Sequence, residues 1–142
     1  MVINEKFDFM IEDKNIVFFD GICNFCNSSV DFIWKNNKKR NIYYASLQSR
    51  FAKEFLEKFD EDIKMNTIYY YSQGVIYKKS RAISKICIEL KNPYPILGFF
   101  IKLSSFIGDV FYDVVSNNRY QIMGKKDSCR IPSNEEKSFF LD

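Results

Sequence analysis

Residues 16–26 read Ile16-Val17-Phe18-Phe19-Asp20-Gly21-Ile22-Cys23-Asn24-Phe25-Cys26. The first four residues are β-branched or aromatic and favour a buried strand, and Gly21 lets the chain turn where that strand ends. A helix is predicted to begin at the cysteines, because apolar positions then recur at helical spacing: Cys26, Val30, Ile33 and Trp34. The basic run 38–40 stands where cations favour the negative end of a helix dipole. The two cysteines are therefore predicted to lie at the positive end of this helix.

Two cysteines at this position are suited to thiol chemistry. Unpaired N–H groups and aligned peptide dipoles at a helix N-terminus stabilise a thiolate, which is the form that attacks disulfides. Cys23 is therefore predicted to be the attacking sulfur. Cys26 lies about one turn further on the same helix face, so it is predicted to resolve the mixed disulfide.

The spacing of the pair by itself leaves three uses open, namely redox exchange, metal binding and structural thiols. A zinc site needs further ligands, whereas the chain has no histidine and its other cysteines, Cys87 and Cys129, are far apart in sequence. The lack of histidine also excludes Ser-His-Asp, Cys-His and His-ligated metal mechanisms. We expect no metal and no bound cofactor, and we favour redox exchange.

The composition indicates a single compact domain over residues 1–142, because 46% of the residues are hydrophobic. A net charge of +3, from 21 basic and 18 acidic residues, is too small and too evenly spread to indicate nucleic-acid binding. Residues 1–13 lack the basic start and apolar stretch of a signal peptide, so we expect the cytoplasm as location. In that compartment a close cysteine pair is more often catalytic, redox-sensing or metal-binding than a permanent crosslink.

The rest of the chain alternates between strand and helix patterns. Strands are predicted at 41–45, 67–71 and 75–77, the last two joined as a hairpin by a turn at 72–74. Helices are predicted at 47–59, from Ser80 as N-cap to about 92, and from Ile96 to Ser116. This order predicts an α/β fold, with a mixed β-sheet covered by helices and an added C-terminal helical segment.

The segment Ile96–Val115 is the most apolar part of the chain and therefore a candidate membrane span. Lys102, Asp109 and Asp113 interrupt it, and charged residues are costly inside a bilayer. The segment is therefore predicted to be a packed amphipathic helix, and no transmembrane segment is expected.

The order β-α-β-α-β-β-α resembles the core of the thioredoxin fold, in which a C-x-x-C motif sits where the first core strand meets its helix. That fold carries a cis-proline loop that faces the cysteines and precedes the third strand. Here Asn66 stands in the place of the proline, and Thr67 follows it. By this resemblance Asn66 and Thr67 are candidate substrate-binding residues, and the missing proline implies that substrate handling differs.

A closer resemblance is to the DCC family of thiol-disulfide oxidoreductases, named for one aspartate and two cysteines. Asp20, Cys23 and Cys26 are similar to its signature. Further matches cover nearly the whole chain: Leu47-Gln48-Ser49, Ser80-Arg81-Ala82, Tyr112, Asn118-Arg119-Tyr120 and Cys129. The resemblance implies a thioredoxin-like oxidoreductase whose partners are a disulfide-containing protein or small thiol and a recycling reductant. The alternatives are a non-catalytic protein-binding module and a metal-binding protein that uses the cysteine pair.

Roles for the remaining candidates follow from their surroundings in the sequence. Asp20 is predicted to cap the helix, the alternatives being to orient the loop or to accept a proton from a cysteine. Cys87 lies on an apolar helix face and is expected to be buried and inert. Cys129 stands among cations and is a candidate third redox cysteine or an ordinary surface thiol. Arg119, with its neighbour Tyr120, either approaches the motif or serves a structural salt bridge.

Overall fold

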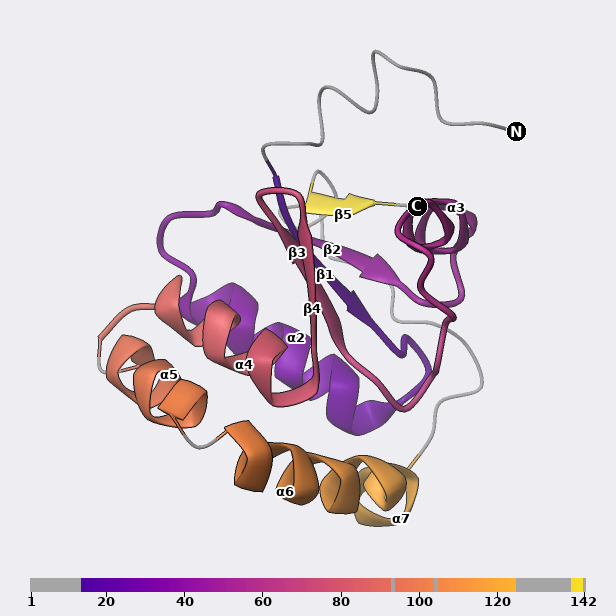
Figure 1. Ribbon diagram of the computed structural model, residues 1–142. Coiled ribbons are helices and arrows are strands. Elements are labelled where there is room, and N and C mark those ends of the chain that lie inside the picture. The colour runs from indigo at the N-terminus through magenta and orange to yellow at the C-terminus, as the bar shows by residue number, and fades with distance from the viewer. Residues whose placement is uncertain (1–13, 93, 104, 125–138, 142) are drawn as a thin grey trace.

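The apolar run after Lys14 forms β1 (Asn15–Phe19), the central strand of a five-stranded sheet of order β4-β3-β1-β2-β5 (Figure 1). β2 (Ile42–Ser46) pairs with β1 in parallel, and β3 (Tyr69–Ser72) pairs with its other edge antiparallel. β4 (Val75–Lys78) is antiparallel to β3, and β5 (Phe140–Leu141) runs parallel to β2. The computed structural model describes residues 14–92, 94–103, 105–124 and 139–141. The mixed α/β sheet confirms the predicted fold class and is consistent with a thioredoxin-like fold.

Helices cover both faces of this sheet. α2 (Asn24–Asn36) and α4 (Lys79–Ile88) lie on one face, and α3 (Arg50–Lys58) lies on the other (Figure 1). Successive side chains of a strand point to opposite faces, so Val17 and Phe19 pack toward α2 and α4, whereas Phe18 packs toward α3. Because both faces are covered, β1 is apolar at every position from residue 16 to 19, and this is the continuous run seen in the sequence.

The hairpin between β3 and β4 confirms the predicted turn. Gln73 and Gly74 occupy its two central positions, with φ of 49° and 81°. Positive φ at both positions is the geometry that continues the twist of the flanking strands, and glycine adopts it without steric cost.

Two predicted helix starts are wrong in detail. The helix predicted from residue 47 begins at Arg50, because Ser49 is its N-cap and accepts a hydrogen bond from the Ala52 N–H at 3.1 Å. Ser80 does not cap α4, whose N-cap is Lys78. Its hydroxyl and its backbone N–H instead both donate to the carboxylate of Asp109. The carboxylate of Asp109, which is 29 residues further along the chain, thus binds the backbone at the start of α4.

The helix predicted at 96–116 is two helices, α5 (Tyr94–Leu103) and α6 (Ser105–Asn117), which are bent by 108° relative to each other. α5 packs along α4, where Gly98 meets the backbone of Ser84. α6 lies against the start of α4, and its Tyr112 hydroxyl accepts the Ile68 N–H at 2.7 Å. One straight rod cannot make both sets of contacts.

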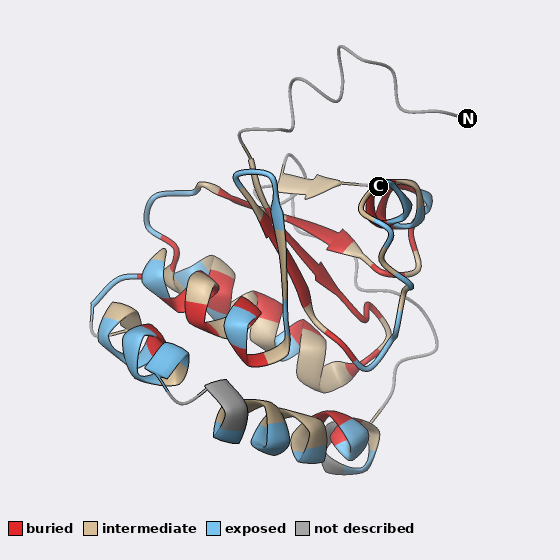
Figure 2. Ribbon diagram, in the orientation of Figure 1, coloured by how far each residue is buried: buried red, intermediate tan, exposed pale blue. Residues whose placement is uncertain are grey.

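A further short helix, α7 (Arg119–Met123), follows α6 and packs against α2. Figure 1 shows α5, α6 and α7 as a layer outside α2 and α4, on the side away from the sheet. α5 and α6 pack on α4 as predicted, but many of their large apolar side chains are exposed, and Figure 2 shows exposed residues along both helices. Within the described ranges, no one helix has the length and apolarity to cross a membrane, and α5 and α6 meet that criterion only when joined as a bent pair.

Candidate active site

Cys23 is the N-cap residue of α2, which confirms the predicted position at the helix N-terminus. Its sulfur accepts a hydrogen bond from the Cys26 N–H, with a nitrogen to sulfur distance of 3.3 Å. The side-chain amide of Asn27 donates to the carbonyls of Gly21 and Cys23, both at 2.8 Å, and so fixes the loop that leads into the helix. Cys23 has 0% exposed surface.

Cys26 lies one turn further along and is half-buried. Burial raises the pKa of the Cys26 thiol far above its ordinary value, and a hydrogen bond with Cys23 and the negative charge of Asp20 raise it further. Both sulfurs are free thiols. Cys26 is therefore a protonated thiol at neutral pH.

Asp20 is buried at the end of β1 and is surrounded by donors. Its Oδ1 accepts from Gln48 Nε2 at 2.6 Å and from the Ile22 N–H at 3.2 Å. Its Oδ2 accepts from Arg119 Nη2 at 3.1 Å and from the Tyr120 hydroxyl. Burial raises the pKa of Asp20, but the hydrogen bonds from Tyr120, Gln48 and Arg119 outweigh it and hold the pKa below 3.8.

The carboxylate of Asp20 is therefore ionised at neutral pH, and this limits its chemistry. A carboxylate with a lowered pKa is a poor proton acceptor for a thiol whose pKa is raised. The predicted role as helix cap is also wrong, because Cys23 occupies the N-cap. Of the three roles considered for Asp20, the contacts favour the orientation of the motif loop.

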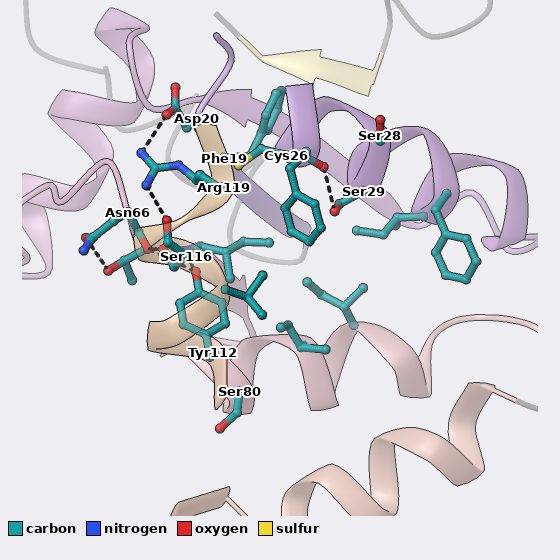
Figure 3. A pocket seen from close by; sticks show the side chains of 18 of the residues that line it. Phe19, Asp20, Cys26, Ser28, Ser29, Asn66, Ser80, Tyr112, Ser116 and Arg119 are labelled. Atoms are coloured by element: carbon teal, nitrogen blue, oxygen red, sulfur yellow. Dashed lines mark hydrogen bonds and ion pairs between the residues drawn. The ribbon is translucent and has the colours of Figure 1, made fainter. Parts of the chain in front are cut away.

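Arg119 of α7 joins Asp20 to the rest of the site. Its Nη2 donates to Asp20 and to the Met65 carbonyl at 3.2 Å, and its Nη1 donates to the Ser116 carbonyl at 2.9 Å (Figure 3). Arg119 is buried and lies 99 residues from Asp20 in the chain. The two possibilities considered for Arg119 are thus both met, since it approaches the motif and forms a buried ion pair there.

The loop before β3 lies beside this cluster and contains Asn66 and Thr67. The Asn66 carbonyl accepts from the Ser116 hydroxyl, and its side-chain amide donates to Asn117 at 3.4 Å. The Thr67 hydroxyl donates to the Asn66 side chain at 3.3 Å. The polar groups of this loop are thus bonded to α6 and to each other, while Met65 is bonded to α7. Asn66 and Thr67 both line the same cavity as Cys26.

This cavity has a volume of about 560 Å³ and lies between α2, α4, α6 and the loop before β3 (Figure 3). Cys26 and Asp20 lie at its wall. Most of the other lining side chains are apolar: Phe25, Phe32 and Ile33 from α2, Ile83 and Ile86 from α4, and Phe111 and Val115 from α6. A cavity of this size and character is typical of sites for small apolar ligands or side chains.

The other predicted thiols are less closely tied to the motif. Cys87 is buried, as expected, and burial raises its pKa. It lines the same cavity as Cys26. Cys129 lies outside the described residues. In the described part of the chain, no group of three or more His, Cys, Asp or Glu residues is placed to hold a metal ion.

Three residues that hold the site together by hydrogen bonds have no predicted role from the sequence: Gln48, Ser116 and Asn27. The position of Gln48 near Asp20 could have been predicted, because Gln48 follows β2 and Asp20 follows β1. These two strands are parallel neighbours, so they end at the same edge of the sheet. Asn27 is a polar residue one turn after Cys23 on a helix face that is otherwise apolar. Ser116 gave no signal, because its bond to Asn66 depends on the tertiary packing of α6.

Comparisons with known proteins agree with this geometry. The sequence profile of the family described as DCC1-like thiol-disulfide oxidoreductase matches residues 17–125. A chloroplastic DCC family protein of Arabidopsis thaliana is 35% identical over 134 residues, which cover 91% of this chain and 77% of that protein. The uncharacterized protein YuxK of Bacillus subtilis is 32% identical over 129 residues, covering 90% of this chain and 94% of that protein. No solved structure matches the chain. The chain belongs to the DCC1-like thiol-disulfide oxidoreductase family.

Proposed function

We propose that this protein exchanges disulfides with a protein or small-thiol substrate, with Cys23 as the attacking sulfur and Cys26 as the resolving one. The observation that carries the proposal is the Cys26 N–H donated to the Cys23 sulfur at the first turn of α2. A sulfur that accepts a backbone hydrogen bond at a helix N-terminus is stabilised as the thiolate. The raised pKa of Cys26 supports its assignment as the partner that stays protonated until the second step.

The proposed cycle balances without a bound cofactor. The Cys23 thiolate attacks one sulfur of the substrate disulfide, that S–S bond breaks, and the other substrate sulfur leaves as a thiolate that takes up a proton. Cys26 then loses its proton and attacks the Cys23 sulfur, which releases the second substrate thiolate and leaves Cys23 and Cys26 as a disulfide. A recycling reductant supplies two electrons and two protons to restore the dithiol. We place this cycle in the cytoplasm, where the glutathione pool keeps such pairs reduced.

Attack on an external disulfide requires Cys23 to become accessible, because it has no exposed surface. The Gly124 carbonyl, at the end of α7, accepts the Asn24 N–H of the first turn of α2 at 3.3 Å. We propose that this contact opens during the cycle. The same movement frees the Met65 carbonyl from Arg119, so that the loop with Asn66 and Thr67 can contact the substrate.

The test is the reduction of a model protein disulfide, with single variants of the two motif cysteines. Cys23→Ser is expected to reduce the substrate no faster than the uncatalysed reaction. Cys26→Ser is expected to accumulate a mixed disulfide on Cys23, because the resolving sulfur is missing, and mass spectrometry of the alkylated protein identifies that adduct. Cys87→Ser is the matched control and keeps the parental rate. Equal rates for Cys23→Ser and the parent contradict the proposal.

A second candidate function is a non-catalytic binding module. The apolar cavity beside Cys26 favours it, because a cavity of about 560 Å³ can hold an apolar ligand or side chain without thiol chemistry. The double variant Cys23→Ser and Cys26→Ser distinguishes the two functions. A binding module keeps its biological activity in this variant, whereas an oxidoreductase loses it.

A further inference from the structure

α5 and α6 expose large apolar side chains along their outer sides. Each of the following is between 50% and 71% exposed: Ile96, Leu97, Phe99, Phe100, Leu103, Ile107, Val110, Phe111 and Val114. We call this set the apolar face. It belongs to two helices of the layer that lies outside α2 and α4 (Figures 1 and 2). Exposed apolar areas that span neighbouring helices are typical of surfaces that bind a partner or a membrane.

Where α5 and α6 touch α4, small and polar residues make the closest contacts. A Cβ at Gly98 would lie 2.7 Å from the Ser84 carbonyl oxygen, so α5 and α4 approach closely. The Ser84 hydroxyl donates to the Gly98 carbonyl at 2.7 Å across this contact. Between α4 and α6, Ser80 lies against Gly108 and donates to Asp109.

This combination of an exposed apolar face and small or polar contacts differs from that of a helix on a protein surface in water. Such a helix turns its apolar stripe toward the core and its polar residues toward solvent. Helices surrounded by lipid show the opposite pattern, with apolar side chains outside and contacts between helices made by small residues and interhelical hydrogen bonds. The contacts of Gly98 and Ser84, and of Ser80 and Asp109, follow the second pattern.

From this pattern we infer that α5 and α6 bind the surface of an anionic lipid bilayer, with the apolar face inserted among the acyl chains. The exposed cations of α4 and α5 fit such a surface. Arg81 of α4 and Lys102 of α5 are exposed cations, whereas Asp109 is bonded to Ser80 and Asp113 pairs with Lys79 at 3.0 Å. Exposed cations beside an inserted apolar face strengthen binding to anionic headgroups.

A protein partner fits the apolar face less well. Protein interfaces are enriched in Tyr, Trp, Phe, Met and Arg, and they carry about one hydrogen bond per 100–200 Å². The side chains of the apolar face are Phe, Leu, Ile and Val, which have no hydrogen-bonding atom. The lipid interior requires none.

Membrane binding has a geometric consequence for the site. Ile101 of α5 and Phe111 of α6 also line the cavity beside Cys26. The cavity therefore lies directly behind the helices that contact the bilayer. The inference itself rests on the apolar face and not on the proposed redox function.

The experiment is flotation of the full chain with vesicles of phosphatidylcholine, with and without phosphatidylserine. The parent is expected to float with both and more strongly with phosphatidylserine. Phe100→Asp and Phe111→Asp are each expected to lower the bound fraction about tenfold or more, because a carboxylate in the acyl region is costly. Val75→Asp is the matched control, since Val75 is 47% exposed but lies on β4, and it binds like the parent.

A second kind of variant changes only a surface charge, so that the test does not depend on the folding of the two Asp variants. Lys102→Glu keeps the apolar face and is expected to weaken binding to phosphatidylserine vesicles while leaving binding to phosphatidylcholine unchanged. A parent that stays in the aqueous fraction with both kinds of vesicle overturns the inference. So does a parent that sediments as a dimer, binds no vesicles and becomes monomeric as Phe100→Asp, because the apolar face is then an interface between two copies.

Discussion

On the α3 side of the sheet, Phe18 stacks on Phe51 and Phe55 in a buried aromatic cluster, whereas the α2 and α4 side holds a buried ion pair and a cavity. The ring centroids of Phe18 and Phe55 are 5.5 Å apart, and that of Phe55 lies 4.9 Å from Tyr71. On the other side, Asp20 and Arg119 are kept from water by the packing of α7. Both sides of the sheet thus hold a buried apolar core, and the α2 and α4 side holds the ion pair and the cavity in addition.

The largest expected effect on the site side is that of Asp20→Asn. The variant leaves Arg119 buried beside a neutral amide, and breaking a buried ion pair in this way costs about 3–5 kcal/mol in the free energy of unfolding. The disulfide exchange rate is expected to fall as well, because Asp20 also holds Gln48 and the Ile22 N–H of the motif loop. Urea unfolding and reduction of a model protein disulfide measure the two effects.

The matched control for Asp20→Asn removes the charge that the variant leaves unpaired. Arg119→Met in the Asp20→Asn background is expected to recover part of the lost stability, because no buried charge then remains. A double variant that is less stable than Asp20→Asn contradicts this explanation.

A change on the α3 side is expected to separate stability from activity. Phe55→Ala removes a ring from the aromatic cluster and leaves a void, which costs about 3–5 kcal/mol in the free energy of unfolding. The exchange rate per folded molecule stays at the parental value, because the cluster does not touch the motif. Urea unfolding gives the fraction folded, and the exchange assay is run below the transition. If the exchange rate per folded molecule falls along with stability, the α3 side also affects the exchange reaction.

The architecture was largely predictable because its signals are local. The buried run of β1, the glycine of the β3–β4 turn and the apolar spacing of α2 each report on a few neighbouring residues. These signals fixed the order of strands and helices through α4 and placed Cys23 at the start of α2.

Several of the errors share a cause, which is a partner distant in the chain. Ser80 was predicted to cap α4, but it donates to Asp109, which lies 29 residues further along the chain. The ion pair of Asp20 with Arg119 joins residues that are 99 positions apart and could not be predicted from neighbouring residues. The break between α5 and α6 depends on where α4 lies. Arg119 and Gln48 are among the residues that match the family, but a sequence match does not show which residues contact each other.

A smaller effect is expected where α5 approaches α4 on the site side. Gly98→Ala places a Cβ against the backbone oxygen of Ser84, which cannot move easily, and costs about 1–3 kcal/mol in the free energy of unfolding. Gly108→Ala is the matched comparison, because its Cβ would lie 3.1 Å from the Ser80 side chain. We expect Gly108→Ala to cost less. Equal losses in urea unfolding would show that the α4–α5 contact is no closer than the α4–α6 contact.

A pH change from neutral to mildly acid has the smallest effect, a gradual loss of the stability that Asp20 contributes on the site side. The pKa of Asp20 is lower in the folded protein than its ordinary value of 3.8, so below neutral pH the unfolded chain takes up a proton more readily than the folded one. The stability that Asp20 contributes is therefore complete above that ordinary value and is lost as the pH falls through the folded pKa. Urea unfolding over a pH series is expected to show the parent and Asp20→Asn converging in acid, while the difference between the parent and Phe55→Ala stays constant. If the first difference is constant as well, Asp20 does not owe its stabilising effect to an ionised carboxylate, and the contrast between the two sides of the sheet is one of packing alone.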